Sequence, residues 1–476
     1  MKRFIQGQDR TQSTLLPELL DEYIAEDNPV RVIDVFVDQL ALSELGFAGV
    51  NPAQTGRPSY HPAAMLRLYI YGYLNRIQSS RRLEAEANRN VELMWLIARL
   101  NPDFKTIARF RNENGPAIRK VCSQFVELCR RMHLFADSMI AIDGSKFKAV
   151  NNCDKNYTQA KIKKRMQEVE KNIQQYLDDL EAADISSPKQ STPHQVRLTE
   201  RIAMFQAQMK TLETIESEVQ SSPDKQVSQT DPDARSMQHR GGGIVGYNVQ
   251  AAVDTKHHLI VAHEVTTAGH DRTQLANIGK QAKDALQKEA LTVVADKGYY
   301  KGEEVAACVE NGITPIMPKC LTSGNKANGL FDKRHFVYDP KSNTYQCPAG
   351  ELLIERYRSL ESGKNLTTYW SSQCKKCALK SSCTTSDQRR IKRWENEAVL
   401  DQMQSNLEKM PDAMKIRRCT IEHTFGTLKH WMGASHFLMK TKSHVSTEMS
   451  LHILAYNMKR VMKIMGSVAL MKAMAT

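Results

Sequence analysis

The 476-residue sequence predicts an α/β protein with a mixed-sheet core, an all-helical N-terminal domain and two insertions, one a helical hairpin and one small and cysteine-rich. Three observations lead to this prediction. Through the first 135 residues, apolar side chains recur three and four positions apart, which is the period of an amphipathic helix. From Ser138 onward, short apolar runs typical of strands alternate with helical segments. Two long stretches of different composition interrupt that alternation.

The N-terminal helices carry much of the positive charge of the chain. Residues 61–131 contain 13 basic and 6 acidic side chains, and the segment beginning SSRRLEAEA places two arginines in a helical pattern. A basic helical surface favours a polyanionic partner. We therefore expect residues 1–135 to form a helical, DNA-binding domain, with candidate contacts at Arg81, Arg82, Arg109 and Arg111.

The core is predicted from residue 136 to the C-terminus. A strand at 139–142 ends at Asp143, and two alternating strands follow in NVQAAVDTKHHLIVAHEV. A helix at 272–288, the strand LTVVAD at 291–296, a helix near 302–310 and a strand at 313–317 complete it. The order strand, strand, strand, helix, strand, helix, strand indicates a mixed α/β sheet.

The first insertion is expected at 155–243. Apolar residues repeat in alternating four- and three-residue steps from Ile162 to Leu180 and again from Leu198 to Leu212, on either side of a Ser/Pro-rich break at 184–193. This pattern predicts an antiparallel helical hairpin with a structural apolar stripe. Residues 220–243 are polar and rich in turn formers, so we expect a mobile loop there.

The second insertion is expected at 320–400 and contains a cluster of cysteines. Two cysteines separated by two residues can turn back on one ion, so four thiols that include such a pair could bind zinc tetrahedrally. Free thiols are the alternative. The candidate zinc ligands are Cys347, Cys374, Cys377 and Cys383.

The overall composition restricts the class of protein. Lys and Arg number 66 against 53 Asp and Glu, which gives a formal net charge of +13. The N-terminus MKRFIQGQDRTQ lacks the apolar core of a signal peptide, and no run of about 18 apolar residues suggests a membrane span. We expect a cytoplasmic protein whose ten cysteines are thiols or metal ligands rather than disulfides.

Two carboxylates stand directly after predicted strands. Asp143 lies in IAIDGSKFKA and Asp296 in VVADKGYYKG, and either could by itself be an ordinary turn residue. If the two strands are neighbours, both carboxylates reach one end of the sheet. Close carboxylates repel each other unless a cation or a proton lies between them, so the pair predicts a divalent metal site.

A third acidic ligand is available in the C-terminal segment MKIRRCTIEHTFGTLKHW. On a helix, Arg418, Glu422 and Lys429 share one face. A solvated Arg–Glu pair is the plain alternative. An acid flanked by two cations also suits a metal ligand beside cations that bind phosphates.

These motifs together resemble those of the DDE transposases of bacterial insertion sequences, over nearly the whole chain. IDGS and ADKGYY look like the first and second Asp motifs of that family, and Arg418 to Lys429 matches the R-x3-E-x6-K core of its Y-R-E-K signature. The Tyr of the signature falls at Lys415, so its role is not carried over. The cysteine-bearing insertion also resembles one found in a branch of the family, which adds support for zinc.

The resemblance implies an RNase H-like catalytic domain at 136–476, in which Asp143, Asp296 and Glu422 bind two Mg²⁺ or Mn²⁺ ions for DNA cleavage and strand transfer. It implies phosphate contacts by Arg418 and Lys429, with Lys146 and Lys297 as weaker candidates. The expected partners are terminal inverted repeats and target DNA, bound by a homodimer or larger assembly. In a bacterium, the protein would then associate with the nucleoid.

Other interpretations remain open from the sequence. A metal-dependent nuclease with the same fold would use the same three acids, and a transposon-derived DNA-binding protein could have lost catalysis. The heptad hairpin alone could serve as an assembly scaffold. His263, His270 and Asp271 could form a polar site near the end of the sheet, but an Asp that caps the helix beginning near Arg272 is the favoured interpretation.

Overall fold

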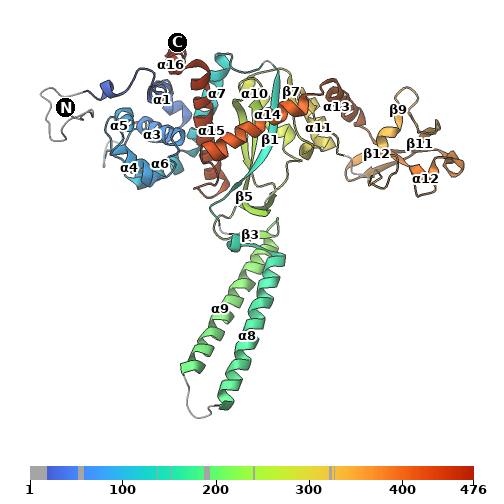
Figure 1. Cartoon of the computed structure of the whole chain (residues 1–476), viewed down its shortest axis with the longest axis horizontal. Coiled ribbons are helices and arrows are strands. Elements are labelled where there is room, and N and C mark those ends of the chain that lie inside the picture. Colours follow the sequence, from blue (N-terminus) through green and yellow to red (C-terminus); the bar gives the residue numbers. More distant parts are fainter. Residues whose placement is uncertain are drawn as a thin grey trace, which may run out of the picture.

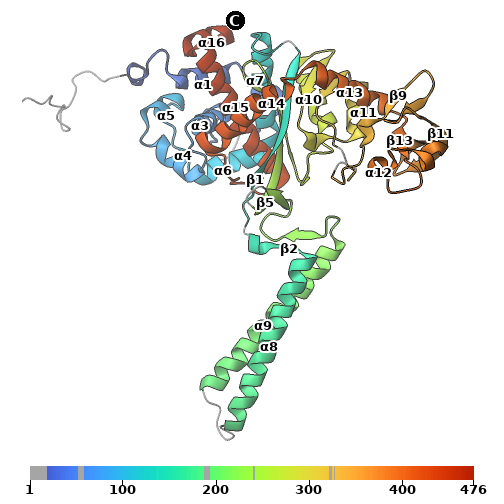
Figure 2. The same cartoon turned by 45° about the vertical axis from the view of Figure 1, so that its right-hand side comes forward.

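The computed structural model of the chain places a mixed sheet at the centre, with the N-terminal helices to one side and the cysteine-rich insertion to the other (Figure 1). A long helical hairpin extends away from the sheet in both views (Figure 2). The residues that the structure describes are 19–51, 58–136, 138–151, 153–186, 193–239, 242–320, 324–325 and 327–475.

The central sheet has the strand order β6-β5-β1-β7-β8, with β4 pairing the first part of β5. β5 runs antiparallel to both β1 and β6, whereas β1–β7 and β7–β8 pair in parallel. The sequence order of strands and helices is the one predicted, with α10 before β7 and α11 before β8. The bounds are β1 (Met139–Lys148), β4 (Arg235–His239), β5 (Gly242–Asp254), β6 (Ile260–Thr266), α10 (Leu275–Leu286), β7 (Leu291–Val294), α11 (Gly302–Glu310) and β8 (Ile313–Ile316).

Strand β1 is longer than the sequence predicts, and Asp143 lies within it rather than at its end. The apolar half of the strand stops at Ile142, but pairing with β5 continues to Lys148, which lies opposite Gly246. The polar half is extended because a partner strand satisfies its backbone groups, which side-chain pattern alone does not reveal.

Alternate residues of β1 face two different cores. Ile140 and Ile142 pack with α10 and α11, whereas Ala141 and Phe147 pack on the opposite face, in a core that also contains Ile421 of α14. Side chains alternate along a strand, so Asp143 lies on the α14 face and Gly144 on the α10 face. Helix α14 (Ala413–Gly426) continues into a short π-helical turn (Thr427–Trp431).

The N-terminal helices share their core with the half of the chain that contains the central sheet. The C-terminal helix α15 packs on α3, α7 and β6, and α16 packs on α1, so one continuous core joins both ends of the chain. Residue 135 is therefore not a break in the hydrophobic packing. These helices are α1 (Pro29–Asp38), α2 (Leu42–Leu45), α3 (Pro62–Leu74), α4 (Ser80–Ala87), α5 (Val91–Leu96), α6 (Phe104–Glu113), α7 (Gly115–Arg131), α15 (Lys442–Met465) and α16 (Ser467–Ala475).

The first insertion contains two long helices, α8 (Gln159–Ser186) and α9 (Pro193–Ser221). Ile162 and Val169 of α8 pack against Leu212, Ile215 and Val219 of α9 near the base of the hairpin. The prediction of a loop at 220–243 is wrong for most of the residues that the structure describes there. Residues Gln226–Ser228 form β3, which pairs with the distant β2 (Asn156–Thr158), and β4 extends the central sheet by pairing with β5, the strand that follows it.

The second insertion is built on a separate antiparallel sheet of order β13-β12-β11-β10-β9. Helix α13 (Glu397–Lys409) leads from it back to α14, and its Leu400 and Met403 pack in the core beside α11. The strands are β9 (Val337–Asp339), β10 (Thr344–Gln346), β11 (Leu352–Glu361), β12 (Lys364–Trp370) and β13 (Ile391–Trp394).

Among the described helices, none combines the length and the apolar character needed to cross a lipid bilayer.

A buried carboxylate ties the segment after α14 to the shared core. Glu448 of α15 is fully buried and accepts hydrogen bonds from the backbone N–H of Leu438 at 2.9 Å and of Met439 at 2.9 Å. Glu448→Ala would leave the buried Met439 N–H and the partly buried Leu438 N–H without this partner, and we expect it to destabilise the protein by about 2–4 kcal/mol. The shift in the denaturation midpoint in urea measures this. Glu448→Gln keeps one acceptor oxygen and should cost less than Glu448→Ala, and equal costs would contradict the role of these bonds.

Candidate active site

The first two acids are brought together by the parallel pairing of β1 and β7. Ala141 of β1 lies opposite Val294, the last residue of β7. Two residues farther along each chain, Asp143 and Asp296 therefore reach the same level of neighbouring strands, which are about 4.8 Å apart. Asp296 also begins a short 3₁₀ turn (Lys297–Tyr299) by accepting a hydrogen bond from the Gly298 N–H.

The third acid reaches the pair through an arginine. One guanidinium nitrogen of Arg417 lies 2.9 Å from Asp143 Oδ2, and the other lies 3.9 Å from Glu422 Oε1. Arg417 is 12% exposed, whereas the Glu422 side chain is 58% exposed, so the arginine reaches inward while the glutamate stays at the solvent-facing edge. A cation thus joins an acid of β1 to an acid of α14.

Opposing effects act on the pKa of the Asp143 carboxyl. Burial raises its pKa to about 6, Arg417 and the Gly144 N–H oppose that rise, and the charge of Asp296 adds to it. The Gly144 N–H donates to Asp143 Oδ1 at 2.8 Å. Neighbouring carboxylates repel each other unless a cation lies between them, and carboxylate oxygens are ligands that hard divalent metals prefer.

The acids do not surround a common point as their side chains stand. Over the described part of the chain, no three His, Cys, Asp or Glu side chains are arranged to hold a metal ion. The position between Asp143 and Glu422 is instead taken by the Arg417 guanidinium. Carboxylate oxygens are suitable ligands for a divalent cation, and the Arg417 guanidinium already places a positive charge between Asp143 and Glu422.

The arginine that the sequence singled out is not the one that meets the acids. Arg418 is exposed, whereas its neighbour Arg417 contacts Asp143 and Glu422. Adjacent helical residues are separated by about 100° around the axis, so exchanging one for the other changes the face completely. Sequence spacing alone could not choose between them, since β1 defines the inward face of α14.

Lys429 binds the strand rather than facing solvent. It lies in the π-helical turn after α14, and its ammonium donates to Ser145 Oγ at 2.7 Å and to the Lys146 carbonyl at 2.8 Å. It also lies 4.4 Å from the centre of the Phe147 ring. Burial and the nearby Lys146 lower the pKa of Lys429 to about 8. In this arrangement its charge is directed to β1, two residues from Asp143.

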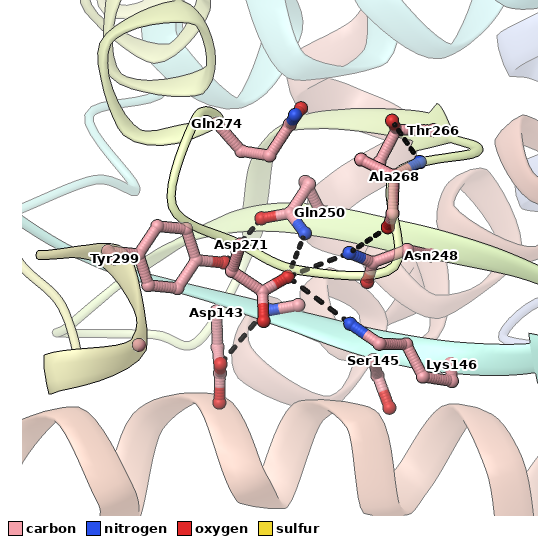
Figure 3. A network of polar contacts seen from close by, with 12 residues as sticks. Asp143, Ser145, Lys146, Asn248, Gln250, Thr266, Ala268, Asp271, Gln274 and Tyr299 are labelled. Carbon is pink, nitrogen blue, oxygen red and sulfur yellow. Dashed lines mark hydrogen bonds and ion pairs between the residues drawn. The ribbon is translucent and has the colours of Figure 1, made fainter. Parts of the chain in front are cut away.

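A polar network supports β1 from the opposite face (Figure 3). Asp271 Oδ1 accepts hydrogen bonds from Asn248 and Gln250 of β5, each at 2.7 Å, and lies 3.4 Å from Lys146 Nζ. A side chain at position 144 would collide with Gln250 and Asp271, so the glycine after Asp143 allows this close approach.

Two predictions are corrected by this network. Asp271 does not cap a helix: α10 begins only at Leu275, and no side chain caps it. Lys146 is 11% exposed and paired with Asp271, which is incompatible with a free phosphate contact. The histidines do not join the network: His270 is exposed, and His263 Nε2 is 2.9 Å from Ser450 Oγ of α15.

Tyr299 is a site residue that sequence analysis missed. It is buried, and its hydroxyl donates to Gln250 Oε1, which connects the turn after Asp296 to the network behind Asp143. Burial and then the charges of Asp271, Asp143 and Asp296 raise its pKa well above the usual value. The signal was present in the motif ADKGYY, but only the fold shows which Tyr turns inward.

The remaining cationic residues predicted to contact DNA are exposed, with one exception. Arg81 and Arg82 of α4 and Arg109 of α6 are exposed, and the two helices pack on each other, with Arg81 over the Phe104 ring. Lys297, beside Asp296, is also exposed. Arg111 is corrected: it is 7% exposed and donates to the Tyr73 hydroxyl at 2.9 Å, so it belongs to the core and is not a DNA contact.

The four clustered cysteines converge in the second insertion. They line one small cavity, and none of the three acids lines it. They therefore form a separate group from the catalytic candidates.

Comparison with known proteins identifies two transposase domains in the chain. Residues 18–113 match the family described as Transposase domain (DUF772), and residues 216–458 match the family described as Transposase DDE domain. The second match contains Asp296, Glu422 and Arg417, while Asp143 and β1 precede it. No curated protein matches the chain.

One solved structure is similar over most of the chain, a cryo-EM structure of a piggyBac transposase synaptic complex with hairpin DNA. It is 9% identical, the match covers 94% of this chain and 79% of that one, and the TM-score is 0.31. A score this low does not establish a shared fold, so the family assignment rests on the domain matches. The DDE match spans slightly more than half of the 476 residues. The chain therefore belongs to the DDE transposase family of insertion sequences, whose members cleave and join DNA with divalent metal ions.

Proposed function

We propose that Asp143, Asp296 and Glu422 form the catalytic centre of this transposase and bind two Mg²⁺ or Mn²⁺ ions. The observation that supports this most strongly is the parallel register of β1 and β7, which brings Asp143 level with Asp296. The ionic link from Asp143 through Arg417 to Glu422 supports the third member. Bound divalent metal activates the attacking water or 3′-hydroxyl and stabilises the leaving oxygen in an in-line displacement.

In this proposal Arg417 is a positioning residue that holds the acids before metal binds. Its guanidinium neutralises Asp143 and Glu422, which would otherwise repel one another and Asp296. Because the same oxygens are needed as metal ligands, Arg417 and the metal compete for them. Release of the guanidinium would leave it beside the reacting phosphodiester, where its paired donors suit phosphate oxygens.

Other cations take different roles. We propose that Lys429, through Ser145 and the Lys146 carbonyl, holds the polar half of β1 straight and so fixes Asp143. The exposed Arg418 and Lys297 lie beside the catalytic acids in sequence and are our candidates for phosphates near the scissile bond. Lys146 supports the site from behind through Asp271.

We propose that residues 1–135 recognise DNA and that residues 136–476 carry out catalysis. The DNA ends would bind the basic surface of α4 and α6. Arg81, Arg82 and Arg109 are exposed there, and contacts of this kind position a duplex through its phosphates. The terminal inverted repeats and target DNA would be held by a homodimer or larger assembly, because joining two ends requires both to be present. The substrate places this activity on the chromosome, in the cytoplasm of a bacterium.

Cleavage and strand transfer on labelled insertion-sequence ends test the catalytic assignment. Glu422→Gln keeps the shape of the side chain but removes its charge, so we expect activity to fall on the order of 100-fold or more while end binding is retained. Glu408→Gln, on the exposed side of α13, is the matched control and should retain activity. Full activity of Glu422→Gln would exclude Glu422 as a ligand. If the native protein binds ends and cuts nothing, it is an inactive DNA-binding relative, and if it cuts without joining, it is a nuclease.

Competition between Arg417 and metal is measured by Mn²⁺ titration of the DNA-free protein. Arg417→Ala removes the competing cation, so we expect Mn²⁺ to bind about tenfold more tightly, while the metal-free protein melts at a lower temperature. The titration is made at pH 8, above the pKa of about 6 of Asp143 in the native protein. Arg418→Ala is the control and should change neither quantity. If Arg418→Ala alone bound Mn²⁺ more tightly, Arg418 rather than Arg417 would be the arginine that pairs with the acids.

Salt dependence of end binding tests the α4–α6 surface. Replacing Arg81 and Arg82 together with Ala should weaken binding and reduce the slope of log K against log salt by about 2, because each phosphate contact releases roughly one counterion. Arg358→Ala in the second insertion removes a similarly exposed, Glu-paired arginine and should leave the slope unchanged. An unchanged slope in the double variant would show that the DNA ends bind a different surface.

A further inference from the structure

The four cysteines of the second insertion meet although they come from three separate segments. Cys347 follows β10, Cys374 and Cys377 belong to the turn after β12, and Cys383 ends the short helix α12 (Lys380–Cys383). All four line one cavity of about 30 Å³. A single water needs about 10–15 Å³ on this measure, so the cavity has room for one small ion.

Both thiol-bearing loops are tight turns of the backbone. The Gly350 N–H donates to the Cys347 carbonyl at 2.9 Å, and the Cys377 N–H donates to the Cys374 carbonyl at 3.4 Å. Turns of this size allow a thiol and the groups that follow it to point at one centre. The CKKC pair has the two-residue spacing found in zinc sites with four sulfur ligands.

The sheet packs on the central core through Trp394 of β13, and the core beside the cavity is small. Its buried side chains are Phe336, Tyr345, Leu353, Tyr369 and Ile391. These five hydrophobic residues serve a five-stranded sheet that lies at the far side of the molecule from the N-terminal helices (Figure 1). Small domains with so few core residues usually depend on a disulfide or a metal.

Two cationic side chains border the cavity. Arg389 and Lys380 line it together with the four cysteines. A zinc ion with four thiolates carries a net charge of −2, which the surrounding cations would offset.

We propose that Cys347, Cys374, Cys377 and Cys383 bind one structural zinc ion that joins the loop after β10 to the loop after β12. Binding replaces four S–H bonds by four Zn–S bonds and releases four protons to solvent, with no change in oxidation state. The sulfurs are not arranged as ligands as they stand. Rotation of the cysteine side chains within the shared cavity would bring them to the ion. With four protein ligands the site is closed and has no position for a substrate.

Zinc analysis of the full-length protein tests this inference independently of transposition. Native protein purified without chelator should contain one zinc per chain by elemental mass spectrometry. Replacing Cys374 and Cys377 together with Ser should remove it, whereas Cys320→Ser, at an exposed thiol outside the cavity, should retain it. Glu422→Gln should also retain zinc, which separates this site from the catalytic one.

A second measurement does not depend on the folding of variants. Native protein stripped of metal and given Co²⁺ should develop the visible absorption of a tetrahedral cobalt thiolate, and zinc should abolish it. Native protein that holds no zinc and shows no such absorption overturns the proposal. Zinc retained by the double Cys variant also overturns it, because the ligands would then lie elsewhere.

Discussion

The pairing of β1 with β7 is the constraint on which the proposed catalytic site depends. Their parallel register makes Asp143 and Asp296 neighbours although 152 positions separate them in the sequence. The same register places two like charges together at the end of a buried sheet, and that is costly without a cation. Arg417 supplies the cation here, and its contact with Glu422 brings the third acid of α14 to the same place.

Support for β1 comes from both faces of the sheet. On the face of α14, Lys429 holds Ser145 and the Lys146 carbonyl, while Phe147 packs into the shared core. On the opposite face, Asp271 draws together side chains of β5 and Lys146. A catalytic group is useful only when its position is fixed by its surroundings, and Asp143 lies in the middle of these two sets of contacts.

The insertions leave this arrangement intact because they enter at loops. The helical hairpin leaves the sheet after β1 and returns at β4, and the cysteine-rich sheet lies between β8 and α13. The N-terminal helices are different, because α15 joins them to the sheet in one core. Motion of the N-terminal helices relative to the three acids would therefore disturb hydrophobic packing, whereas motion of the hairpin would not.

The sequence by itself determined the class of the core, the order of its strands and helices, the family, and the three acids as candidates. These follow from local periodicity and from short motifs, which the chain carries within single segments. Only the tertiary structure decided the length of β1, the strands within 220–243, and the choice of Arg417 over Arg418. It also showed that Arg111 is buried, that Lys146 is largely covered and paired with Asp271, and that Asp271 serves a network rather than a helix. Except for β4, which pairs with the strand that follows it, each of these depends on a partner distant in sequence, because pairing, burial and ionic contact are properties of two segments and not of one.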